Sequence, residues 1–160
     1  MSFDPSAVAA SESLVFLSFT STDAFELGVR LRTTLAAHPS KAPCVIEITT
    51  AGGQRLFFAA SGEGTAFEHG EIVRRKRASV LRWGKSTASL YLQWPEGVPA
   101  VFGAKDADYL CHGGGFPVRI KGVEPIVAVI VVSGLAQEED HQIIADAVEK
   151  YIKEQEAAQK

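Results

Sequence analysis

The stretch HGGGFPVRIKGVEPIVAVIVVSGLAQEEDHQIIADAVEKYI, residues 112–152, has the most regular patterning in the chain. Its residues 126–132 are apolar without a gap and, apart from Ala128, β-branched. Such a run is typical of a strand that is buried on both faces. Upstream of it, three consecutive glycines, 113–115, predict a turn or a close backbone approach. After them, Phe116-Pro117 opens a short extended segment, residues 118–121, so the two segments predict a hairpin.

Downstream of this strand the pattern changes to that of a helix beginning near Ala136. Residues 138–140 are all acidic, and the helix macrodipole favours anions in a first turn. Apolar residues then recur at helical spacing: Ile143, Ile144, Ala147, Val148, Tyr151 and Ile152. We therefore expect the hairpin and this helix to form one packed unit.

The first half of the chain predicts a second hairpin with further helices. Residues 44–50 alternate apolar and polar, and residues 55–60 follow a turn that contains the glycines a tight hairpin requires. Helices are expected over 21–38 and over 67–83, and a short strand at 14–17. The fold class predicted is α+β, an antiparallel sheet built from two hairpins with helices packed on it.

Length and composition predict one domain with two tails. The chain has 160 residues, of which 46% are hydrophobic and 22% charged, as in ordinary soluble domains. Residues 1–12 are small and polar and predict a flexible N-terminal tail. We expect a single domain over 13–152 and a fraying tail over 153–160.

The charge and the longest apolar runs exclude several classes of partner. A net charge of −3 gives no general attraction to nucleic acid or to an anionic membrane. No apolar run is long enough to cross a bilayer, and the N-terminus has no signal-peptide pattern. We expect a cytoplasmic protein without nucleic-acid or membrane partners. Two cysteines without a C-x-x-C pair predict neither a disulfide framework nor a structural zinc site.

The most charged stretch is Arg74-Arg75-Lys76-Arg77. Successive helix positions turn by about 100°, so four such residues in a row cannot all face water if the helix has a buried side. Lys76 and Arg77 lie three or four residues from the apolar positions of this helix. A cation at such a position requires a negatively charged partner. A bound ligand with an acid group would provide it, and so would a salt bridge to a neighbouring subunit; a side chain that extends to water would avoid the need.

Two further groups of residues are candidates for a binding site. His112 precedes Gly113, Gly114 and Gly115, whose backbone N–H groups could approach an anion or a planar ligand. A neutral imidazole could also ligate a metal, although a histidine beside a turn often only hydrogen-bonds the loop. Asp140 and His141 extend the apolar face of the last helix, close to Ser133. They predict either a small polar pocket or a helix cap.

These segments resemble a known family. HGGGFPVRIKG followed by IVAVIVVSGLAQEEDHQIIADAV resembles the closing hairpin and helix of the haem-degrading-domain family of GlcG-like and HbpS-like proteins, and VRRKRASVLRWGKST, residues 73–87, resembles its middle helix. The chain most resembles the branch called uncharacterised protein family 0303. The resemblance covers most of residues 14–151 and implies a profilin-like sheet and a homo-oligomer. It also favours a helix over 86–94, where the apolar pattern fits a strand as well.

The resemblance suggests three hypotheses about function. The first is an oligomeric binding protein for a small anionic or planar ligand, with haem as the cofactor that the family implies. Lys76, which falls on a lysine of the family's middle helix, or Arg77 would then meet acid groups such as haem propionates, and His112 or His141 would meet the iron. The second is a structural or adaptor oligomer that binds partner proteins. The third is an enzyme that degrades haem.

Overall fold

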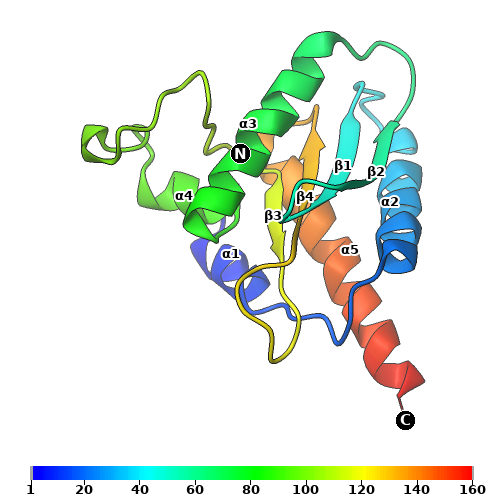
Figure 1. Cartoon of the computed structure of the whole chain (residues 1–160). Helices are drawn as coiled ribbons and strands as arrows, with labels where there is room; N and C mark the ends of the chain where they lie inside the picture. The colour runs from blue at the N-terminus through cyan, green and yellow to red at the C-terminus, as the bar shows by residue number, and fades with distance from the viewer. Residues whose placement is uncertain (1, 160) are drawn as a thin grey trace.

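The computed structural model describes residues 2–159, and four strands with five α-helices make up most of it (Figure 1). In chain order the elements are α1 (Pro5–Ser11), α2 (Ser21–Ala36), β1 (Val45–Thr50), β2 (Arg55–Ala60), α3 (Phe67–Trp83), α4 (Thr87–Gln93), a 3₁₀ turn η1 (Ala100–Phe102), β3 (Gly115–Val118), β4 (Ala128–Ser133) and α5 (Gln137–Ala158). The predicted α+β class is confirmed.

The four strands form one antiparallel sheet in the order β2-β1-β4-β3. Both hairpins are present, and their inner strands β1 and β4 pair with each other, so that Ile48 lies opposite Ile130. The prediction of a strand buried on both faces is confirmed for β4, all six of whose residues are buried. The pairing of β3 with β4 ends at Val118, whereas the sequence predicted an extended segment over residues 118–121. The chain then leaves to pair with Phe16, which makes only an isolated bridge to Ile120 instead of a strand.

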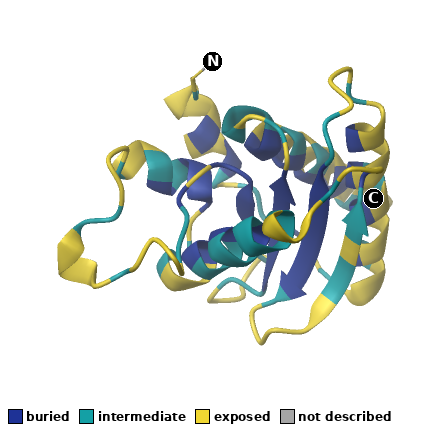
Figure 2. Ribbon diagram, turned by 90° about the horizontal axis from the view of Figure 1, so that it is seen from above, coloured by how far each residue is buried: buried dark blue, intermediate teal, exposed yellow. Residues whose placement is uncertain are grey.

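Helices cover both faces of the sheet (Figures 1 and 2). One face carries Ile46, Ile130 and Val132, which pack with α2 and α5 in the larger core cluster. On the other face, Val129 and Val131 pack against α3 in a smaller cluster. The alternation of adjacent β4 residues between these two clusters explains why residues 128–132 of the strand include no polar side chain.

Local signals in the sequence account for the helix boundaries. Thr20 and Asp23 form a capping box at the start of α2. The predicted span of α3 is confirmed, and the helix ends where Gly84 takes a left-handed conformation at φ 67°. Ser86 accepts a hydrogen bond from the Ser89 backbone N–H and begins α4, so residues 86–94 contain a helix, as the family resemblance favoured.

The expectation of a flexible N-terminal tail is wrong for residues 5–11. Asp4 caps α1, Pro5 occupies its first turn, and Val8 is buried at 4% exposure. Composition alone missed this helix because only two of its side chains are buried. At the other end, α5 continues to Ala158, and Gln155 hydrogen-bonds the backbone of Leu17 and Ser18. No helix within residues 2–159 has the length and apolar character needed to span a membrane.

Candidate functional site

Lys76 is the inward-facing cation of α3, and its partner lies within its own chain. The side chain is 3% exposed. Its Nζ lies 3.3 Å from Asp140 Oδ2 and 3.2 Å from the Val132 carbonyl oxygen. The ion pair therefore joins α3 to the start of α5 around the end of β4. The negatively charged partner of Lys76 is thus a carboxylate of its own chain.

Asp140 completes this buried polar cluster. Its carboxylate also accepts hydrogen bonds from the backbone N–H groups of Gly134, at 3.3 Å, and Leu135, at 3.0 Å. Burial raises the pKa of Asp140 to about 6 against the opposing charge of Lys76 and these hydrogen bonds. Burial likewise lowers the pKa of Lys76, against the attraction of Asp140. Asp140 is both a cap for the β4–α5 connection and the counterion of Lys76.

The three glycines make their close approaches to protein atoms. A Cβ on Gly114, at φ 123°, would lie 2.3 Å from the Val132 carbonyl oxygen and 2.7 Å from Lys76 Nζ. The Gly113 N–H donates to the Gln137 side chain, and the Gly115 N–H to Thr87 Oγ1. The glycines thus allow this segment to lie against the buried ion pair, and those two N–H groups are already occupied.

His112 is exposed and is shared by two cavities. The first, here called the polar cavity, has a volume of about 310 Å³ and is lined by Lys76, Ser133, Asp140 and a second histidine, His69. It brings together four of the residues singled out in the sequence: Lys76, His112, Ser133 and Asp140. Of the two alternatives that the sequence left open at the start of the last helix, a polar pocket and a helix cap, Asp140 has features of both, whereas His141 does not line this cavity.

The second, here called the aromatic cavity, lies on the other side of His112 and is also about 310 Å³ in volume. Its walls include Tyr91, Trp94 and Tyr109, and Arg75 of α3 lines it as well. The imidazole of His112 meets the Tyr91 ring edge-on at a centroid distance of 5.9 Å. Partial burial and the positive charges of Lys76 and Arg75 lower the pKa of His112, which favours the neutral imidazole at neutral pH.

The structure places Arg77 away from these cavities. It pairs with Glu47 of β1, whose side chain is 3% exposed and which also meets Arg55 at 3.2 Å. Arg77 lines a separate hollow beside β2, together with Phe58 and Phe67. Like Lys76, it meets a carboxylate of its own chain.

His141 also lies elsewhere, buried beneath α1. Its Nε2 is 3.2 Å from Ser11 Oγ, and the Phe3 ring packs edge-on against it at 6.1 Å. Burial lowers its pKa, so the imidazole is neutral. Its Nδ1 has no hydrogen-bond partner within residues 2–159. His141 lines neither cavity, because α1 covers it.

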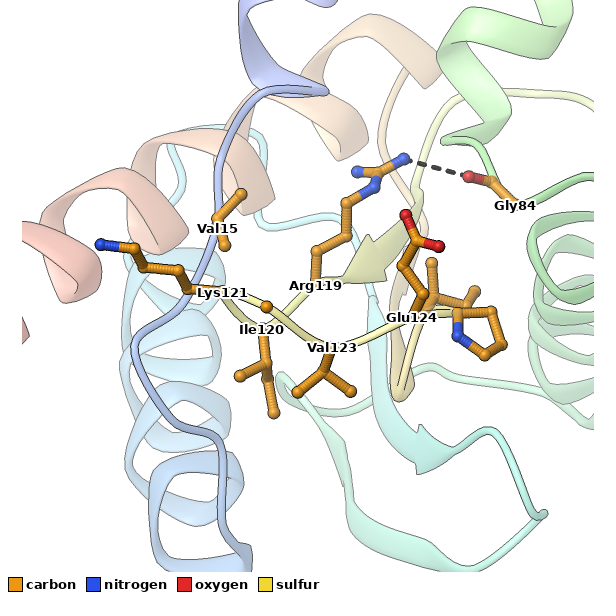
Figure 3. Close-up of a pocket in the computed structure, with 10 residues that line it drawn as sticks. Val15, Gly84, Arg119, Ile120, Lys121, Val123 and Glu124 are labelled. Atoms are coloured by element: carbon orange, nitrogen blue, oxygen red, sulfur yellow. Dashed lines mark hydrogen bonds between the residues drawn. The ribbon is translucent and has the colours of Figure 1, made fainter.

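A larger hollow of about 1080 Å³ lies beside the turn that follows β3 (Figure 3). Arg119, Lys121 and Glu124 are its charged residues. The Arg119 guanidinium donates to the Gly84 carbonyl oxygen at 3.0 Å and pairs with Glu12 at 2.7 Å. Its charge is therefore already compensated, and none of the residues singled out in the sequence lines this hollow.

The remaining groups within residues 2–159 include no cluster that could form a metal centre, and neither cysteine has a lowered pKa. Burial raises the pKa of Cys44 to about 11, and burial also raises that of Cys111. Among the described residues there is no group of three or more His, Cys, Asp or Glu side chains that could hold a metal ion. The site is suited to binding a ligand through one imidazole and nearby cations.

Sequence reasoning missed His69, Arg75 and the aromatic residues of the second cavity. Arg75 belongs to the four-residue basic run and lies three residues from Ile72, but its other neighbours one turn away are Glu71, Ala78 and Ser79, so the apolar pattern did not single it out. The available signal was Ala78 and Ser79 about one turn later, small residues that allow another segment to approach. Ser79 Oγ does accept a hydrogen bond from the Leu110 N–H at this point.

Solved structures place this fold in a known class of α+β proteins. The Ybr137w protein superposes with a TM-score of 0.88 at 25% identity, covering 95% of this chain and 89% of that one. The structure of a PduOC:heme complex superposes with a TM-score of 0.63 at 19% identity, covering 84% of this chain and 94% of that one. The second likeness concerns the fold alone.

Sequence comparison gives the family. The family model described as "Haem degrading protein HbpS-like" matches residues 19–149. A UPF0303 protein of Brucella melitensis biotype 1 is 38% identical over 148 residues, which cover 91% of this chain and 85% of that protein. The chain therefore belongs to the HbpS-like haem-degrading family, and the predicted resemblance is confirmed.

Proposed function

We propose that this protein binds a small planar ligand with an acid group, foremost haem, in the groove formed by the two cavities on either side of His112. The observation that carries the proposal is the position of His112: its exposed side chain lines both the polar and the aromatic cavity. Haem enters the proposal through the family and through the haem-bound PduOC structure.

The residues around His112 fit such a ligand. A neutral imidazole is the form that ligates iron, and the lowered pKa of His112 favours it. Each cavity is near the lower end of the range of roughly 300–1,000 Å³ for small-molecule sites, so a macrocycle would lie across both. When bound, haem would supply a redox-active iron. His112, with His69 as the second candidate, would hold that iron, whereas His141 is covered by α1.

Titration with haemin, followed by the Soret band, tests this proposal. We expect His112→Ala to weaken haemin binding at least tenfold and His69→Ala to weaken it less. His38→Ala is the control, because His38 pairs with Glu139 and lines neither cavity. Circular dichroism establishes that each variant is folded. If wild type gives no Soret shift, or if the three variants bind haemin alike, the proposal is wrong.

A second candidate function, assembly of several copies that bind partner proteins, is favoured by exposed apolar side chains. Phe67 is 86% exposed and Val101 is 87% exposed. Large exposed apolar residues often mark contact surfaces. Native mass spectrometry reports the number of subunits and any retained ligand together. A single-subunit mass for wild type, unchanged by Phe67→Ser, would rule out assembly through this residue.

Catalytic breakdown of haem is the third candidate. The raised pKa values of both thiols disfavour a thiolate as participant. His112 is therefore the side chain whose replacement tests catalysis. Loss of the haem band with ascorbate, measured with and without protein, tests this candidate. Only a protein-dependent rate that falls in His112→Ala supports catalysis, because free haem also decays.

A further inference from the structure

Arg75 is half-buried on α3 and forms one side of the aromatic cavity. Its Nε is buried and has no hydrogen-bond partner within residues 2–159. No carboxylate in that part of the chain forms an ion pair with its guanidinium. A partly desolvated cation without a counterion is unfavourable, so an anion bound beside Arg75 would stabilise it.

The other arginines of α3 all have partners. Arg74 donates to the Glu71 carboxylate at 3.0 Å and to the Ala107 carbonyl oxygen at 3.1 Å. Arg77 pairs with Glu47, and Arg82 donates to the Phe102 carbonyl oxygen at 2.6 Å. The absence of a partner is therefore specific to the one arginine of this helix that faces the aromatic cavity.

The groups around Arg75 determine the kind of ligand that would satisfy it. Tyr91, Trp94 and Tyr109 offer aromatic surface to a flat ring system, while a guanidinium binds a carboxylate through two parallel hydrogen bonds. Glu96 and Asp106 also line the cavity, but both are exposed and their charges are screened by water. The cavity combines three aromatic side chains with one cation that has no ion-pair partner within residues 2–159.

We propose that Arg75 binds the carboxylate of a planar aromatic or macrocyclic ligand whose ring system lies in the aromatic cavity against Tyr91 and Trp94. This inference rests on the proposed function, since it assigns the anchor for the acid group of the ligand that His112 meets. The carboxylate enters beside α3, and the ring system extends toward His112. The basic residue that recognises the acid is Arg75, because Lys76 and Arg77 already have carboxylate partners.

Binding of 2-naphthoate and of its neutral analogue 2-naphthamide tests the anchor without haem. The shift of the Trp94 indole N–H signal in NMR spectra gives both affinities. We expect wild type to bind the acid at least tenfold more tightly than the amide. Arg75→Gln is expected to abolish this preference, and Arg75→Lys to restore part of it. Arg74→Gln, on the same helix but paired with Glu71, is the matched control and should retain the preference. Equal binding of acid and amide by wild type, or no binding of either, would overturn the proposal.

Haemin and metal-free protoporphyrin IX separate this inference from the proposed function. Both carry propionates, but only haemin has iron. Arg75→Gln should weaken both by a similar factor of at least five, and His112→Ala should weaken haemin alone. Haemin binding that depends on His112 but not on Arg75 would leave the proposed function intact and overturn the anchor. Naphthoate binding that depends on Arg75, without any haemin binding, would support the anchor and refute haem.

Discussion

The buried pair of Lys76 and Asp140 is the most consequential contact of single residues in this protein. Both side chains are less than 5% exposed, and their charges lie 3.3 Å apart. Desolvation of the two charges offsets much of their attraction, so the pair adds little net stability. The pair instead fixes the position of α3 relative to α5, beside the candidate ligand site.

Lys76→Met is expected to destabilise the fold by about 3 kcal/mol, because it leaves the Asp140 carboxylate buried without its counterion. The double variant Lys76→Met/Asp140→Asn should recover at least half of this loss. Urea unfolding measures both effects. Arg74→Met, which breaks an exposed pair with Glu71, is the control and should cost less than about 1 kcal/mol. A cost for Lys76→Met as small as that of the control would contradict this description of the pair.

The pH dependence of stability should reveal the protonation of Asp140. Its pKa is about 6 in the folded protein and 3.8 in the ordinary case. Between these values the folded protein holds a proton that the unfolded chain has lost, so stability falls as the pH rises through this window. Lowering the pH from 7 to 5 should stabilise wild type by about 1 kcal/mol relative to Asp140→Asn, measured as urea midpoints. The opposite sign would show that Asp140 ionises readily in the fold.

The sequence indicated which basic side chains lie near the buried side of α3, but it did not indicate which carboxylates pair with them. Helical spacing placed Lys76 and Arg77 at the apolar edge of the helix, and in the structure the Lys76 side chain is 3% exposed. That Asp140 would be its partner depends on two residues 64 positions apart, on different helices, meeting around a strand end, which no local pattern encodes. For the same reason Arg75, the cation without a partner, could not be distinguished from its neighbours.

At the scale of elements, α1 is joined to the rest of the fold by Glu12, just after the helix ends. Glu12 accepts hydrogen bonds from the Ser86 N–H and from Ser89 Oγ at the start of α4, at 2.8 and 2.7 Å. It also pairs with Arg119, which follows β3. Burial raises the pKa of Glu12, but these hydrogen bonds together outweigh burial and leave the pKa below 4.5. One carboxylate thus ties three segments together.

Glu12→Gln should destabilise the protein by about 2 kcal/mol, because an amide cannot satisfy both the α4 donors and the Arg119 guanidinium. The wild-type contribution is present above pH 4.5 and is lost as the pH falls through the lower folded pKa. Thermal unfolding at pH 7 measures the difference. Glu63→Gln, in an exposed loop, is the control and should leave the melting temperature unchanged. If both variants melt like wild type, Glu12 does not hold α1 in place.

Helices and strands whose apolar residues recur at regular spacing could be predicted from the sequence. Those that depend on tertiary contacts could not. The bounds of α3 and the positions of β1, β2 and β4 follow from apolar spacing and turn glycines. Helix α1 has only seven residues and depends on Asp4 and on contacts with α4 and α5. Short helices of this kind are unstable alone, so their sequence carries little signal.

At the scale of the whole molecule, the fold brings residues from separate segments to one end of the sheet. Arg75 and Lys76 come from α3, Tyr91 from α4, His112 from the segment before β3, and Asp140 from α5. The order of elements predicted the sheet and its helices, but the ligand-sized cavities depend on how the 94–111 segment packs against α3. Under the proposed function, the family makes haem the first ligand to test, and these two cavities are where it would bind.

The most direct test of the binding site is the proton NMR spectrum of the four histidines during titration with haemin. Paramagnetic iron broadens the signals of nearby protons. We expect the imidazole signal of His112 to disappear first and that of His69 next, while the signal of His38 stays sharp. If haemin binds and the His112 signal persists while that of another histidine is lost, haem binds elsewhere and His112 is not its ligand.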